Sequence, residues 1–167
     1  MKAEVALSRH TNDEVAHMLD AWDQFAQGLA SHKRLYGGYS GSNYMVTSCS
    51  GFKGVLKVCN AYATEEVEAQ AQISAHLHTQ GFTQACAAIP RADDASRFTT
   101  TAPDGTPCLL LSWVEGTAAD KVIAAGVAAP TVLRAIGDGL GSLHCVPVLG
   151  SMRTFKTGGA CDVRCEA

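Results

Sequence analysis

The spacing of apolar residues changes from helical to alternating and back along the first half of the chain. A capping box of Thr11 and Glu14 precedes apolar residues that recur every three or four positions, which predicts an amphipathic helix over residues 13–28. Between residues 35 and 59 the pattern alternates, which predicts a hairpin with strands at residues 44–49 and 54–59. Helical spacing returns over residues 65–80, where Thr64 is the expected N-cap, acidic residues occupy the first turn and Gly81 favours the helix end.

The second half of the chain predicts two more strands and then helices. The strands are expected at residues 96–102 and 108–114, and the later one is apolar throughout, which is typical of a central strand covered on both faces. Helices are expected over residues 118–125 and onward from Pro130. Glycines at 137, 139 and 141 lie in the second helix, and we interpret them as a sign that this helix packs closely against another element. This order of elements predicts an α+β fold.

A single lysine interrupts the second strand of the predicted hairpin. Lys57 is flanked by apolar residues, and strand geometry places Leu56 and Val58 on the core face and Lys57 on the other face, toward a cleft. A cation in such a place is costly unless an anion pairs with it, although an edge-strand lysine that reaches water is the ordinary alternative. Residues 37–43 (Gly-Gly-Tyr-Ser-Gly-Ser-Asn) form a turn ahead of it whose backbone N–H groups could approach a phosphate closely. An ordinary β-turn is the alternative for that segment.

Length, charge and the absence of long apolar runs restrict the class of protein. The 167 residues suit one domain, and the net charge of −3 does not indicate a nucleic-acid partner. No apolar stretch approaches the roughly 20 residues that span a bilayer, and no signal core follows Met1. We therefore expect neither a membrane nor a nucleic-acid partner, and a cytoplasmic location.

The cysteines and histidines do not indicate a disulfide framework or a metal site. The seven cysteines are odd in number and scattered, as expected for reduced thiols. His76 and His78 lie two positions apart on a predicted helix and so cannot share a face. Cys161 and Cys165 lack the spacing and the second pair of a zinc site. No metal ligand is predicted in this chain.

Five segments, in this order and spacing, resemble a known family. They are residues 38–44, the strand at 55–58 with its lysine, the helix at 67–82, the strand end at 110–116 (Leu-Leu-Ser-Trp-Val-Glu-Gly) and residues 140–144. Together they resemble the N-terminal lobe of the aminoglycoside phosphotransferase and choline kinase family, and within it the hydroxylysine kinase-like branch. The resemblance implies a protein-kinase-like N-terminal lobe, in which an antiparallel sheet of about five strands packs against one helix. It divides the chain into an N-terminal helical extension (1–32), the lobe (33–115), a hinge exit with the first helices of an incomplete C-terminal lobe (116–148) and an irregular tail (149–167).

The resemblance also implies roles for individual residues. Lys57 would bind the phosphates of ATP or GTP, and Glu68 would pair with it, with Glu65 or Glu66 as alternatives. The turn would cover the phosphates, and the strand end would offer Ser112 and Val114 backbone groups to the base. The implied nucleotide-binding residues are Ser40, Gly41, Ser42, Asn43, Lys57, Glu68, Ser112, Trp113 and Val114.

The sequence departs from the family pattern at the catalytic motifs. No histidine is followed two positions later by an aspartate, and His144 is followed by Cys145 and Val146. The catalytic aspartate, the asparagine after it and the ligands of Mg²⁺ would therefore belong to a C-terminal lobe that this chain lacks. We expect the N-terminal, nucleotide-binding part of a kinase for the hydroxyl of a small amine-bearing metabolite such as hydroxylysine, inactive alone. The alternative is a non-catalytic module that binds a nucleotide or a protein.

Overall fold

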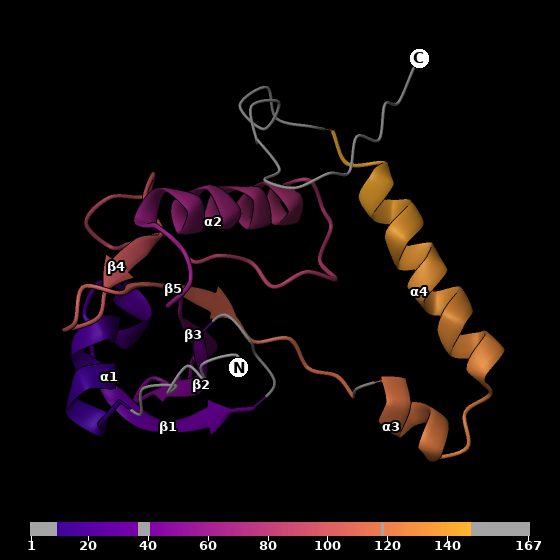
Figure 1. Cartoon of the computed structure of the whole chain (residues 1–167), viewed down its shortest axis with the longest axis horizontal. Coiled ribbons are helices and arrows are strands. Elements are labelled where there is room, and N and C mark those ends of the chain that lie inside the picture. Colours follow the sequence, from indigo (N-terminus) through magenta and orange to yellow (C-terminus); the bar gives the residue numbers. More distant parts are fainter. Residues whose placement is uncertain (1–9, 37–40, 118, 148–167) are drawn as a thin grey trace, which may run out of the picture.

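The computed structural model describes residues 10–36, 41–117 and 119–147, which form one five-stranded antiparallel sheet and four α-helices (Figure 1). The strand order across the sheet is β1-β2-β3-β5-β4. The strands are β1 (Leu29–Leu35), β2 (Ser42–Ser48), β3 (Lys53–Val58), β4 (Thr99–Thr101) and β5 (Pro107–Ser112), and the helices are α1 (Asn12–Leu19), α2 (Thr64–Thr79), α3 (Ala119–Ala124) and α4 (Ala129–His144), with a 3₁₀ turn η1 (Asp23–Phe25). The α+β architecture of a kinase-like N-terminal lobe is confirmed.

Each face of the sheet has its own apolar cluster. The N-terminal segment with α1 and η1 packs on one face, against inward-facing residues of β2, β3 and β5. Helix α2 packs on the opposite face, over β5 and β4. The first cluster includes Met18, Leu19, Trp22, Phe25, Tyr44, Val46, Leu56, Val58 and Leu110, and the second includes Cys59, Val67, Ala71, Phe98 and Leu109. Strand β5 therefore has buried residues on both faces, and the central strand that the sequence predicts is confirmed.

The N-terminal helix is shorter than the predicted range of 13–28. Helix α1 ends at Leu19, the 3₁₀ turn follows, and Gly28 adopts a φ of 91° before β1 begins at Leu29. Trp22 and Phe25 are nevertheless buried as the spacing requires, because α-helical and 3₁₀ turns both return to the same face after about three residues. Strand β1 thus begins inside the segment that was predicted as a helical extension.

Helix α2 begins at Thr64, the residue that the sequence predicts as its N-cap. Ala63, rather than Thr64, is the N-cap residue, and the Glu66 carboxylate accepts a hydrogen bond from the Ala63 N–H at 3.0 Å. An acceptor in the first turn compensates for the unpaired N–H groups of a helix start. The helix ends before Gly81, whose φ of 86° is accessible at low cost to glycine alone.

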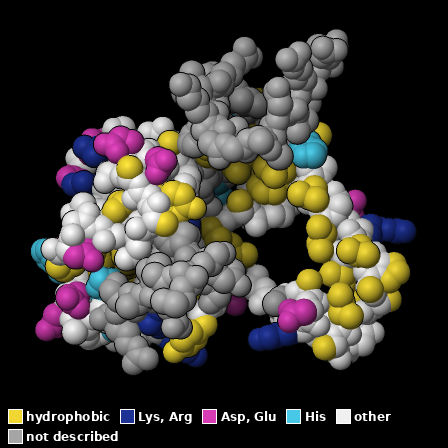
Figure 2. All heavy atoms as spheres, viewed as in Figure 1, with side chains coloured by type: hydrophobic (Ala, Val, Ile, Leu, Met, Phe, Trp, Pro, Cys, Tyr) yellow, Lys and Arg dark blue, Asp and Glu magenta, His cyan; other side chains and the backbone are white. Residues whose placement is uncertain are grey.

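Helices α3 and α4 extend away from the sheet with apolar side chains exposed (Figures 1 and 2). On α4, Leu133, Ile136 and Leu140 keep 64%, 47% and 53% of their surface. The prediction that the glycines of this helix pack closely is wrong for the part of the chain that the structure describes, since no atom lies within 4 Å of a Cβ built at 137, 139 or 141. No helix among the described residues is both long enough and apolar enough to cross a bilayer.

Candidate functional site

Lys57 lies on the face of the sheet that α2 partly covers. Its cross-strand partners are Asn43 on β2 and Leu109 on β5, and these three residues form a row across the sheet. Leu56 and Val58 are fully buried on the opposite face, so the predicted orientation of the strand is confirmed. Helix α2 lies over β5 and β4, and Lys57 on the neighbouring strand β3 remains half-buried. A half-buried lysine on this face is accessible to an anion that approaches it.

The ammonium group of Lys57 has no carboxylate partner in the described part of the chain. The ion pairs there join His17 to Asp20, Lys53 to Glu115 and Arg91 to Asp93. The charge of Lys57 is therefore available to an anion that binds on this face.

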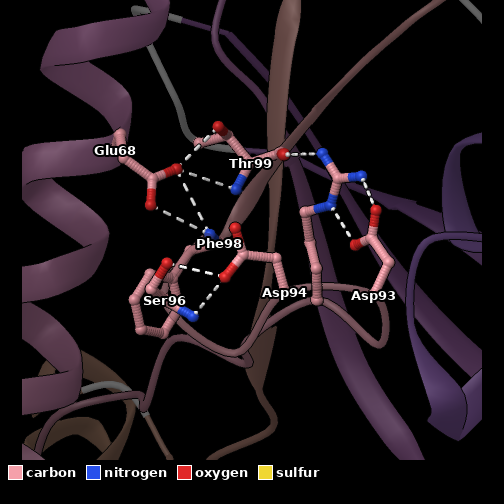
Figure 3. Close-up of polar contacts among 7 residues, drawn as sticks. Glu68, Asp93, Asp94, Ser96, Phe98 and Thr99 are labelled. Atoms are coloured by element: carbon pink, nitrogen blue, oxygen red, sulfur yellow. Dashed lines mark hydrogen bonds and ion pairs between the residues drawn. The ribbon is translucent and has the colours of Figure 1, made fainter.

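Glu68 faces β4 instead of Lys57 (Figure 3). Its carboxylate accepts hydrogen bonds from the backbone N–H of Phe98 at 3.0 and 3.2 Å, from the N–H of Thr99 at 3.0 Å and from the Thr99 hydroxyl at 2.7 Å. The predicted ion pair between Lys57 and Glu68 is therefore not formed in this structure. The physical reason is that the N–H groups at the start of β4 need acceptors, and Glu68 supplies them. Of the two alternatives, Glu66 is bonded to Ala63 and Glu65 is exposed.

The loop before β4 is held by local polar contacts. The Arg91 guanidinium binds both Asp93 carboxylate oxygens and donates to the Thr99 carbonyl at 3.3 Å. The Asp94 carboxylate accepts from the N–H and the hydroxyl of Ser96. These hydrogen bonds lower the pKa of Asp93 and Asp94 and raise that of Arg91. Arg91, Asp93 and Asp94 are therefore charged at neutral pH, and the N–H groups of Phe98 and Thr99 after this loop donate to Glu68.

Gly41, in the glycine-rich segment, lies against the end of β3. Gly41 begins this described segment, and a Cβ built there would lie 2.0 Å from the carbonyl oxygen of Val58. Ser42 is buried opposite Val58, and half-buried Asn43 lies opposite Lys57. The structure therefore places Asn43 beside Lys57 on the same face, whereas Ser42 lies on the face of Val58 and Gly41 lies close to Val58 and Cys59. The predicted residue Ser40 lies outside the described residues.

The end of β5 presents fewer open backbone groups than the sequence predicted. The N–H of Ser112 donates to the Ala87 carbonyl at 2.8 Å, and the Ser112 hydroxyl accepts from the Ala87 N–H at 2.8 Å. Trp113 is half-buried and Val114 exposed, and neither makes a hydrogen bond within the described ranges. Ser112 therefore anchors the segment before β4, while Trp113 and Val114 keep unpaired backbone groups. The pairing of Ser112 with Ala87 was missed from the sequence, where the hydroxyl of Ser112 was the only signal for it.

The buried thiols close to Lys57 are uncharged at neutral pH. Burial raises the pKa of Cys59, an effect that the charge of Lys57 partly opposes. Burial, with smaller contributions from Cys59 and Asp104, raises the pKa of Cys108 to about 12. Neither thiol can act as a nucleophile or as a counterion of Lys57 under these conditions.

The residues that the structure describes do not contain a cluster of three or more His, Cys, Asp or Glu side chains suited to a metal ion. A polar cavity of about 390 Å³ lies between α1 and β4, lined in part by His17, Asp20, Arg91 and Asp93. None of the predicted nucleotide-binding residues lines it. The candidate site is therefore the face of the sheet around Lys57.

Comparison with known proteins identifies the sequence at the family level. A family model described as "Phosphotransferase enzyme family" matches residues 31–157, from β1 to beyond α4. A search of the curated proteins found no match. The family model thus covers Lys57, α2 and the end of β5, and it begins after α1.

Proposed function

Because the chain belongs to the phosphotransferase enzyme family, we propose that it forms the nucleotide-binding part of a small-molecule kinase. In this proposal phosphate passes from ATP or GTP to the hydroxyl of a small amine-bearing metabolite. Hydroxylysine is the acceptor that the resemblance of the sequence favours. Mg²⁺ would arrive bound to the phosphates, and no residue of this chain is assigned as its ligand.

The observation that carries the proposal is the position of Lys57. Lys57 is half-buried, its cross-strand partner is Leu109, and within the described ranges its ammonium group has no carboxylate partner. Desolvating a cation without a partner is unfavourable, and a triphosphate would supply the missing negative charge. Lysine suits this role as a compact point charge.

Two neighbouring segments support the same assignment. Gly41 lies so close to the end of β3 that a Cβ built there would be 2.0 Å from the Val58 carbonyl oxygen, and Asn43, two residues later, lies opposite Lys57. At the other end of β5, Trp113 and Val114 keep backbone groups that a purine could bind, together with the apolar side chain of Leu111. We propose Trp113 and Val114, rather than the N–H of Ser112, as the contacts to the base.

Replacement of Lys57 by methionine is expected to weaken nucleotide binding by about tenfold or more, because a charged hydrogen bond contributes about 1.5–3 kcal/mol. Titration with a fluorescent ATP analogue measures this effect. Lys53→Met is the matched control, since Lys53 is exposed on the same strand and pairs with Glu115. The control is expected to bind like the unmodified chain. Equal affinities of the chain and its Lys57→Met variant would contradict the proposal.

The chain alone is expected to transfer no phosphate from ATP to hydroxylysine. The reaction requires a residue that accepts the hydroxyl proton and residues that hold the metal, and the sequence contains no His-x-Asp motif for the first. A coupled assay for ADP release, with and without hydroxylysine, checks this expectation. Turnover that depends on the acceptor would show that the proton acceptor lies elsewhere in this sequence.

The exposed apolar face of α4 favours a second candidate function, a module that binds a protein. Large exposed apolar patches commonly mark interaction surfaces. Sedimentation measurements separate the two candidates when they accompany the nucleotide titration. Self-association or partner binding without nucleotide affinity would favour the binding module.

A further inference from the structure

Glu68 and Lys57 belong to one row of residues that crosses three strands. Lys57 on β3 lies opposite Leu109 on β5, and Leu109 lies opposite Thr99 on β4. Adjacent strands are about 4.8 Å apart, so the backbones of Lys57 and Thr99 are separated by about 10 Å with Leu109 between them. Glu68, on the helix above this face, binds the Thr99 end of the row.

The carboxylate of Glu68 is fully engaged at β4. Both oxygens accept from Phe98, and one of them also accepts from the N–H and the hydroxyl of Thr99. Thr99 is buried, so its N–H and hydroxyl would lose hydrogen bonds without gaining water if Glu68 turned away. Pairing with Lys57 would therefore require breaking several charge-assisted hydrogen bonds.

The loop that leads into β4 also restricts the position of Thr99, whose N–H and hydroxyl donate to Glu68. Arg91 binds the carbonyl of Thr99 from the opposite side while it is itself held by Asp93 (Figure 3). Thr99 is thus bound through its N–H and hydroxyl to α2 and through its carbonyl to the loop. The arrangement fixes the position of α2 on the sheet.

We propose that Glu68 is a positioning residue that attaches α2 to β4. We further propose that Lys57, which pairs with no carboxylate among the described residues, takes the nucleotide as its anionic partner. The second half of this proposal rests on the proposed function. The first half depends only on the contacts of Glu68. Through the β4–β5–β3 pairing, the attachment of α2 sets the environment of the face that carries Lys57.

A double-mutant cycle on thermal unfolding without nucleotide tests the first half. Glu68→Gln and Thr99→Val are each expected to lower the Tm by about 4–10 °C, and the double variant by little more than the larger single loss. Glu68→Gln combined with Lys57→Met is expected to be additive. Additivity between positions 68 and 99, or coupling between positions 68 and 57, would overturn the proposal.

A conservative replacement keeps the test decisive if Glu68→Gln does not fold. Thr99→Ser retains the hydroxyl that donates to Glu68, so it is expected to keep most of the Tm that Thr99→Val loses. Equal Tm values for Thr99→Val and the unmodified chain would refute the attachment.

Nucleotide affinity tests the second half, because a role of Glu68 in stability alone would leave the affinity of the folded protein unchanged. At a temperature well below the Tm of each variant, Glu68→Gln is expected to bind a fluorescent ATP analogue within about twofold of the unmodified chain, while Lys57→Met loses about tenfold or more. Equal losses in both variants would show that Glu68 serves Lys57. If the unmodified chain binds no nucleotide, the proposed function fails, and the unfolding cycle still decides the role of Glu68.

Discussion

Replacing Trp22 with alanine is expected to destabilise the protein by about 3–5 kcal/mol, the range found when a large buried aromatic side chain is removed. Trp22 is only 1% exposed, and it lies where the N-terminal segment packs on the sheet. Its indole N–H donates to the carbonyl of Ile89 at 2.9 Å, so the substitution also leaves a carbonyl unpaired. The N-terminal segment is expected to detach from the sheet and expose the face that includes Leu56 and Val58.

Chemical denaturation followed by far-UV circular dichroism measures this loss of stability. Trp113→Ala is the matched control, since Trp113 is half-buried beyond the end of β5 and makes no hydrogen bond in the part of the chain that the structure describes. Its effect is expected to be clearly smaller. Trp22→Phe separates the two contributions, because phenylalanine fills most of the volume and lacks the N–H. A Trp22→Ala variant as stable as Trp113→Ala would contradict the packing described here.

Replacing Gly41 with alanine is expected to destabilise the sheet by about 1–3 kcal/mol or more, because an added methyl group would overlap a backbone oxygen. The new Cβ would lie 2.0 Å from the Val58 carbonyl oxygen and 3.3 Å from the Cα of Cys59. Both are backbone atoms of a strand end and cannot rotate away as a side chain would. The start of β2 must therefore shift away from β3, which also moves Asn43 relative to Lys57.

The same substitution at Gly137 gives a control with the opposite expected sign. No atom lies within 4 Å of a Cβ built there, and alanine is favoured over glycine inside a helix by about 0.5–1 kcal/mol. Gly137→Ala is thus expected to raise the Tm slightly, whereas Gly41→Ala lowers it. A neutral Gly41→Ala variant would mean that Gly41 does not approach β3 as closely as the structure indicates.

Much of the sheet could be predicted from local sequence patterns. Alternation placed Leu56 and Val58 in the core, and the apolar run at Leu109 and Leu110 predicted a strand covered on both faces. Helix α2 followed from its spacing, its acidic start and Gly81. These features could be predicted because burial imposes a period on each element separately, without reference to its partners.

The predictions were wrong where one sequence pattern is compatible with two different structures. The apolar positions from Val15 to Phe25 fit one long helix, but the chain forms a helix and a 3₁₀ turn, and then pairs residues from Leu29 onward with β2. The glycines of α4 suggested close packing, but helix propensity does not show whether a partner is present. Long-range pairing and contact decide both cases.

The sequence by itself determined the order of the elements, the face of β3 that Lys57 occupies and the resemblance to a phosphotransferase family, since each of these depends on the local order of residue types. Only the tertiary structure decided the partner of Glu68. A carboxylate on α2 can reach either a lysine on β3 or the N–H groups of β4, and the choice depends on how the loop around Arg91 presents Phe98 and Thr99. That presentation results from contacts between segments about thirty positions apart in the chain, which no local pattern contains.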